Sequence, residues 1–154
     1  MIPRSALLLG LAGLIPFIAA AAVIALRPTY PIGGLNLPLA GYGQMVMLAY
    51  GRVILAFMAG VLWGFAARGQ AGFWAYTASV VPALWVFFAS FLPDAREPAT
   101  LAIGFAALLA LDWAFARAGL TPPWWMRLRS LLTAVVLACL AVTILSDLPI
   151  WKVT

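Results

Sequence analysis

Two charged residues stand inside apolar runs of the sequence and are the first candidates for chemistry. Arg52 lies in the run 50–64, and Asp112 lies in the run 99–116. A charge at membrane depth costs at least about 2.5 kcal/mol on insertion scales, so each residue needs a partner, water or a route to the surface. If both lined one path, they could carry a proton or a small solute across a membrane.

The other residue types argue against several kinds of chemistry. The chain has no histidine and a single cysteine, Cys139. A haem held by histidine, a thiolate metal cluster and a histidine-based catalytic site are therefore not expected. Proton relays use several carboxylates or histidines in series, whereas the apolar runs contain one acid. We expect no enzyme activity, no catalytic residue and no metal site.

The composition is that of an integral membrane protein. Of the 154 residues, 66% are hydrophobic and 8% are charged, compared with about 45–50% and about 25% in soluble proteins. The net charge of +5 comes from basic residues that are scattered and form no run. Anionic phospholipid is therefore the expected charged partner, and nucleic acid is not.

The apolar runs predict an all-α bundle of five transmembrane helices that forms a single domain over 1–154. The predicted helices cover about 5–26, 45–67, 72–92, 99–116 and 126–146. The first run exceeds the apolar core of a signal peptide and is expected to be retained. Within it, Pro16 frees the carbonyl of Ala12 and predicts a kink. The prolines and glycines of 27–44 predict the longest loop.

The distribution of basic residues predicts the orientation of the chain. Five helices place the two termini on opposite sides of the membrane. With the N-terminus inside, the inner segments hold five arginines and the outer segments hold three or four basic residues. Since cytoplasmic segments are richer in basic residues, we predict an N-in, C-out protein of the bacterial inner membrane, with a cytoplasmic N-terminus and a periplasmic C-terminus.

This topology puts Arg52 and Asp112 in opposite leaflets, so they are not expected to pair with each other. The candidate partners of Arg52 are Asp94, Glu97 and Asp147, and those of Asp112 are Arg68, Arg127 and Arg129. We expect Arg52 to reach toward the outer surface and Asp112 to be a neutralised tie between the last two helices. A proton or substrate path is the alternative.

A ladder of small residues on the second predicted helix indicates close helix packing. Ala56, Gly60 and Gly64 recur every four residues, and Trp63 stands beside the last of them. On a helix this spacing makes one smooth stripe that a second helix can approach closely. We expect the stripe to pack inside the monomer, with dimerisation as the alternative.

Aromatic and basic residues before the last helix indicate a membrane interface. Trp124, Trp125, Arg127 and Arg129 follow one another within six residues. Anchoring at the headgroup level is expected, and a site for an anionic lipid such as cardiolipin is the alternative. No cofactor is expected beyond bound phospholipid, although the aromatic residues of the third helix could hold a quinone or pigment.

The string YGRVILAFMAGVLWG, residues 50–64, resembles the signature of the transmembrane protein 69-like family, a domain of unknown function in proteobacteria and mitochondria. Stretches within 2–17 and 123–133 are also similar to that family, and Asp112 stands where its pattern has an acid. Leu62 departs from the polar or basic residue that members often carry before the tryptophan. The resemblance implies five transmembrane helices and an inner-membrane or mitochondrial-type setting, and it supplies no activity.

These observations favour a non-enzymatic accessory or structural subunit of a larger membrane complex. Short loops, a large apolar surface and the lack of a convergent polar site support this interpretation. A respiratory or photosynthetic complex is the expected host, other integral membrane proteins are the expected partners, and gap filling, lipid sealing or assembly is the expected role. The alternative is a small-solute or proton-coupled transporter that uses Asp112 and Arg52.

Overall fold

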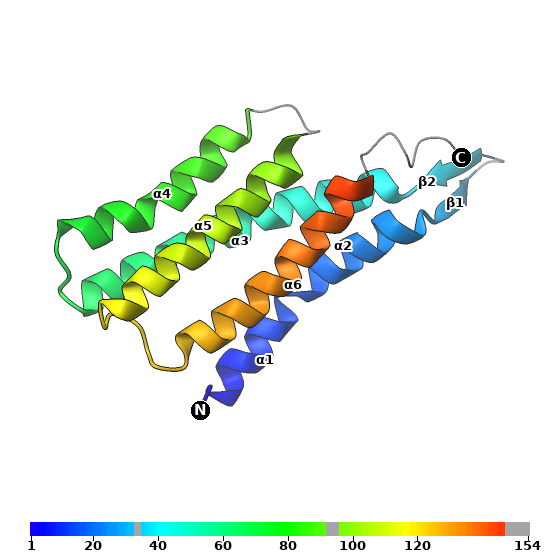
Figure 1. Ribbon diagram of the computed structural model, residues 1–154. Coiled ribbons are helices and arrows are strands. Elements are labelled where there is room, and N and C mark those ends of the chain that lie inside the picture. The colour runs from blue at the N-terminus through cyan, green and yellow to red at the C-terminus, as the bar shows by residue number, and fades with distance from the viewer. Residues whose placement is uncertain (33–34, 92–95, 147–154) are drawn as a thin grey trace.

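A computed structural model describes residues 1–32, 35–91 and 96–146, which form α-helices and one β-hairpin (Figure 1). The elements are α1 (Arg4–Ala12), α2 (Ile15–Leu26), β1 (Thr29–Ile32), β2 (Leu35–Pro38), α3 (Ala40–Arg68), α4 (Phe73–Ala89), α5 (Glu97–Arg117) and α6 (Trp125–Ser146). Because α1 and α2 continue each other as one apolar span, the five predicted helices are all present. The all-α class is confirmed.

Within the described ranges, four spans are long and apolar enough to cross a membrane. They are Arg4–Leu26, Ala40–Arg68, Glu97–Arg117 and Trp125–Ser146. Helix α4 is also apolar but has 17 residues, or about 25 Å at 1.5 Å per residue, against a hydrocarbon core of about 30 Å. The chain is therefore a multi-pass membrane protein in which one helix is shorter than the four spans.

The first span is interrupted where the sequence predicts a kink. Helix α1 ends at Ala12, and Pro16 lies in the first turn of α2. The hydroxyl of Tyr50, on α3, donates a hydrogen bond of 3.1 Å to the carbonyl of Gly13. A side chain from a neighbouring helix thus satisfies a carbonyl that the break leaves exposed.

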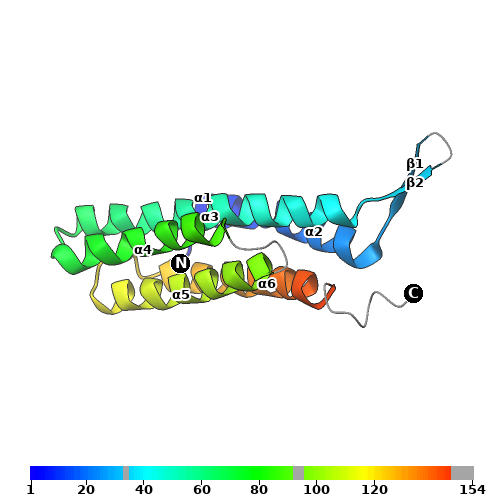
Figure 2. The same ribbon diagram turned by 90° about the horizontal axis from the view of Figure 1, so that it is seen from above.

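The predicted loop 27–44 is more regular than expected. Strands β1 and β2 pair antiparallel, with Thr29 opposite Pro38 and Tyr30 opposite Leu37. Prolines are tolerated in such strands because each strand of a two-stranded sheet has an unpaired edge. Helix α3 begins at Ala40 rather than at about Met45. Figure 2 shows the hairpin projecting beyond the helices at one end of the bundle.

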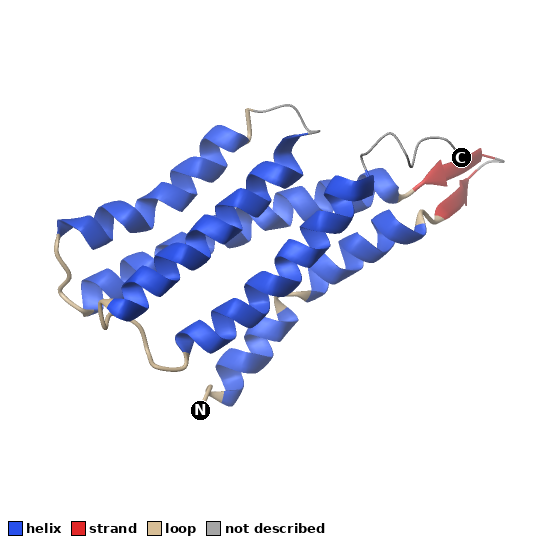
Figure 3. Cartoon of the chain, viewed as in Figure 1, coloured by secondary structure: helices blue, strands red, loops and turns tan. Residues whose placement is uncertain are grey.

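Helix α3 is the centre of the bundle. It contacts α2, α4 and α5, while α6 packs on both α5 and α2 and closes the arrangement. Its buried face includes Leu48, Leu55, Leu62 and Ala66, which lie on one side of the helix. The helices run side by side with the hairpin outside them (Figure 3), so the core of the protein forms along this face of α3.

The bundle has two ends, which we call the N-terminal end and the hairpin end. Helices α1, α4 and α6 begin at the N-terminal end, where α3 and α5 finish (Figure 1). Helices α3 and α5 begin at the hairpin end, where α2, α4 and α6 finish. The two ion pairs described below lie toward opposite ends of the bundle.

Candidate functional site

The carboxylate of Asp112 is buried and binds two side chains of α6. Asp112 is 1% exposed. The indole Nε1 of Trp125 donates to its Oδ1 at 2.7 Å, and Nε of Arg129 donates to its Oδ2 at 2.7 Å. Both carboxylate oxygens are thus occupied. The ion pair is a neutral tie between α5 and α6 near the N-terminal end, and Arg129 is the partner among the three candidates.

Local sequence explains how these side chains meet. Trp125 and Arg129 are four residues apart on α6 and therefore lie on one face, one above the other. Helix α5 ends at Arg117, and Gly119, with φ of +72°, turns the chain back toward α6. A left-handed residue after a helix is a common stop signal, for which glycine carries no steric cost. The turn brings the start of α6 beside Asp112.

The predicted lipid-facing cluster divides between the core and the surface. Trp125 is 8% exposed and Arg129 is 3% exposed, so for these two residues both the expected anchoring at the headgroup level and the alternative of a lipid site are wrong. Trp125 instead packs edge-on against the ring of Phe65, with centroids 4.9 Å apart. Arg127 is exposed and Trp124 is half-buried. A helix places position 127 away from 125 and 129, and the buried Asp112 draws the latter two inward.

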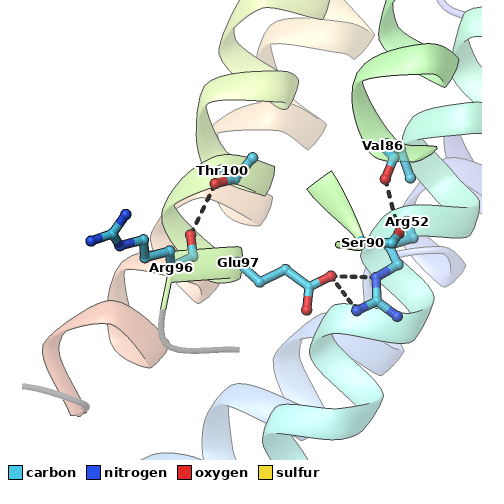
Figure 4. Close-up of polar contacts among 6 residues, drawn as sticks. All are labelled: Arg52, Val86, Ser90, Arg96, Glu97 and Thr100. Carbon is cyan, nitrogen blue, oxygen red and sulfur yellow. Dashed lines mark hydrogen bonds and ion pairs between the residues drawn. The ribbon is translucent and has the colours of Figure 1, made fainter. Parts of the chain in front are cut away.

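Arg52 pairs with Glu97 toward the hairpin end (Figure 4). Its Nε and Nη2 both contact Oε1 of Glu97, the first residue of α5. The side chain of Glu97 is 2% exposed and that of Arg52 is 35% exposed. Of the other candidate partners, Asp94 and Asp147 lie outside the described residues. Arg52 and Asp112 thus have separate partners, as the topology predicts.

Neutralising Arg52 and neutralising Glu97 are expected to lower the stability of the protein by different amounts. A cavity of about 280 Å³ is lined by both residues, but the side chain of Arg52 is partly exposed whereas that of Glu97 is enclosed. Arg52→Gln should therefore lower the free energy of unfolding by about 1–3 kcal/mol, since it leaves a buried carboxylate unpaired. Glu97→Gln should cost less. Unfolding of the two variants in detergent micelles, followed by circular dichroism, tests this order; equal losses would contradict it.

The small-residue stripe of α3 lies on the outside of the protein. A Cβ atom added at Gly60 or Gly64 would meet nothing within 4 Å, and Ala56 is exposed. The prediction that this stripe packs inside the monomer is therefore wrong. Trp63 is 47% exposed and contacts the ring of Tyr76 at 5.0 Å. The core uses the neighbouring face of α3, where larger apolar side chains fill more volume.

Two buried residues of the structure, Gly104 and Thr133, were not among the candidates identified from the sequence. A Cβ at Gly104 of α5 would lie 2.6 Å from Cδ2 of Leu55, so α3 and α5 approach each other there. Thr133 is 1% exposed and lies one turn beyond Arg129. The sequence did contain a signal for Thr133, because Trp125, Arg129 and Thr133 are spaced four residues apart and therefore lie on one face of α6. No comparable signal marks Gly104.

Comparisons with known proteins cover nearly the whole chain. A family model described as "Protein of unknown function (DUF3429)" matches residues 2–145. Transmembrane protein 69 of Xenopus tropicalis is 32% identical over 149 residues, which is 94% of this chain and 55% of that protein. The chain thus spans about half the length of this curated relative. No solved structure matches it significantly.

Proposed function

We propose a function from the premise that this chain belongs to the transmembrane protein 69-like family, whose family model is described as a protein of unknown function. The proposed role is that of a non-enzymatic accessory subunit of a larger membrane complex, respiratory or photosynthetic. Its partners are other integral membrane proteins and anionic phospholipid. It helps to assemble the complex or fills a gap between larger subunits in a bacterial inner membrane.

The observation that carries this proposal is the outward position of the small-residue stripe. Ala56, Gly60 and Gly64 leave a smooth strip on α3 that no described side chain of the protein covers. In lipid, helices gain little from burying apolar surface against each other, so association depends on close backbone approach and packing. A strip of this kind offers that approach to a helix of another membrane protein.

The pairing of the two candidate charges counts against the transport alternative. Arg52 is bound to Glu97, and Asp112 is bound to Arg129 and Trp125. Each pair joins two neighbouring helices, and the pairs lie toward opposite ends of the bundle. A transported ion or proton would have to break one of these ion pairs to use either site, and breaking the fully buried Asp112–Arg129 pair costs about 3–5 kcal/mol.

Exposed arginines support the proposed orientation and the proposed contact with anionic lipid. Arg4, Arg68, Arg117 and Arg127 are exposed, and they stand at the N-terminal end of the bundle. Basic residues near a membrane surface are attracted to anionic headgroups by about 1 kcal/mol each. They are also more frequent on the cytoplasmic side. Both rules favour a cytoplasmic position for the N-terminal end.

The test compares two equal substitutions on exposed faces of different helices. Ala56→Leu puts a large side chain on the stripe, and Ala110→Leu puts the same side chain on an exposed position of α5. After native purification in mild detergent, mass spectrometry should find the wild type in fixed stoichiometry with larger membrane subunits. Ala56→Leu should reduce that recovery by about tenfold, as a loss of about 1.4 kcal/mol would, while Ala110→Leu should not.

Two results of this experiment would contradict the proposal. One is a wild-type protein that is isolated alone or only with copies of itself. The other is equal recovery of the larger subunits with Ala56→Leu and Ala110→Leu. Circular dichroism of both variants shows whether each remains folded, so that a loss of partners is not mistaken for a loss of structure.

A further inference from the structure

A cavity of about 140 Å³ lies beside the buried ion pair, between the first span and helices α3, α5 and α6. Its walls are mainly apolar and include Phe17 and Phe105, each 1% exposed. Two other lining residues, Leu9 and Phe57, are 75% and 64% exposed, so the cavity reaches the outer surface of the bundle. Helix α1 contacts α6 and has at most marginal contact with α3. The cavity therefore opens sideways, toward lipid, next to the kink.

Two polar residues are among those that line this cavity, and each carries a buried hydrogen-bonding atom without a partner. These atoms are Nη2 of Arg129 and Oγ1 of Thr133, and neither has a partner among the described residues. Arg129 is 3% exposed and Thr133 is 1% exposed. Leaving such a group unsatisfied costs about 1–3 kcal/mol, and the great majority of buried polar groups are hydrogen-bonded. Both groups therefore call for an acceptor in the cavity.

Thr133 differs from the other threonines of the described helices. The hydroxyls of Thr77, Thr100 and Thr143 each donate to the backbone carbonyl four residues earlier. This local bond is the usual way for a helix to satisfy a threonine in an apolar environment. Thr133 does not make it, and its hydroxyl is free to donate to an occupant of the cavity.

The geometry and charge of the site define what it can bind. Arg129 and Thr133 lie four residues apart on α6, so one acceptor atom can lie within reach of both donors. A guanidinium only donates, so the bound atom must be an acceptor. The charge of Arg129 is already balanced by Asp112. An added anion would leave a net negative charge in a low-dielectric site, which favours a neutral acceptor.

We propose that this cavity binds a neutral, membrane-soluble molecule through a carbonyl oxygen that accepts hydrogen bonds from Arg129 and Thr133. Two sources supply that chemistry, the ring of a quinone and the ester group of a phospholipid. An apolar protein cavity of about 150 Å³ accommodates benzene, so a single ring fits the volume. The inference rests on the cavity alone and holds whether or not the protein is a subunit of a complex.

The first arm of the test uses a benzoquinone that carries a decyl tail and a ¹³C-labelled carbonyl. The protein is reconstituted in phospholipid nanodiscs and titrated, and infrared spectroscopy follows the labelled carbonyl stretch. Wild type should bind saturably and lower the stretching frequency, as hydrogen bonding does. Thr133→Val, which removes one donor at almost constant volume, should weaken binding about 3- to 10-fold. Thr133→Ser should restore it.

Two further variants control for structure and for location. Thr143→Val removes an equally buried hydroxyl of α6 that lies away from the cavity and bonds to Cys139. It should leave the affinity for the quinone unchanged. Ile54→Phe enlarges a side chain of the cavity wall and should abolish the saturable binding.

The second arm separates the lipid source from the quinone source. Native mass spectrometry compares retention of a diacyl phospholipid with retention of its diether analogue, which lacks the ester carbonyls. A preference for the diacyl lipid that disappears in Thr133→Val would support the carbonyl site and identify the ester as its source. The proposal is overturned if neither molecule shows a dependence on Thr133, which would mean that only water binds these donors.

Discussion

Asp112→Asn is expected to lower the free energy of unfolding by about 3–5 kcal/mol, the usual cost of removing one partner of a buried ion pair. The variant keeps the size of the side chain and leaves Arg129, which is 3% exposed, without a counter-charge. Nearby Thr133 offers a hydroxyl and no charge. Since helices α5 and α6 are tied by this group, much of the variant should be lost during expression.

The comparison with two other variants isolates the charge. Asp112→Leu combined with Arg129→Met removes both charges and should recover most of the stability, because apolar replacement of a buried pair is often neutral or stabilising. Trp125→Phe removes the hydrogen bond to Oδ1 and part of the buried ring system that packs on Phe65, while the Asp112–Arg129 pair stays, and it should cost about 1–3 kcal/mol. Reversible unfolding in micelles gives all three values. If Asp112→Asn lost no more than Trp125→Phe, the ion pair would not be the main tie.

Gly104→Leu is expected to lower the free energy of unfolding by about 1–3 kcal/mol or more, because it overpacks the contact between α3 and α5. A Cβ at this position would lie 2.6 Å from Cδ2 of Leu55 and 3.0 Å from Cδ1 of Trp85. Leu55 is 0% exposed and is packed within the hydrophobic core, so its side chain cannot turn out of the protein to make room. The indole of Trp85 is held by a hydrogen bond of 3.0 Å to the carbonyl of Thr100.

The matched control is Gly60→Leu, which makes the same change on the exposed side of α3. Nothing lies within 4 Å of a Cβ at Gly60, so the isolated protein should keep its stability. Gly104→Ala should fall between wild type and Gly104→Leu. Thermal unfolding in detergent, read by circular dichroism, compares the four proteins. A larger loss with Gly60→Leu than with Gly104→Leu would show that α3 packs through its small-residue stripe after all.

Local sequence was sufficient to predict the helices and the kink. A membrane-spanning segment must satisfy its backbone hydrogen bonds internally and be apolar over about 20 residues, so its position is visible in the chain itself. Pro16 marks the break before α2 by the same local logic, because it lacks an N–H. The need for a partner at Asp112 was also predictable, since a buried charge is costly anywhere in the bilayer.

Only the tertiary structure decided which faces of these helices meet. In a soluble protein a helix has a polar face toward water and an apolar face toward the core, so the sequence shows which face is buried. In lipid both faces are apolar, and the periodicity of the sequence does not distinguish them. The stripe of Gly60 and Gly64 permits close packing without requiring it, and the fold buries Leu55 and Leu62 instead. Likewise, Asp112 had three basic candidates in the sequence, and the rotation of α6 selected Arg129. The same rotation of α6 made Thr133 one of the residues that line the cavity. Neither outcome could be predicted locally, because each depends on how helices far apart in the chain pack together.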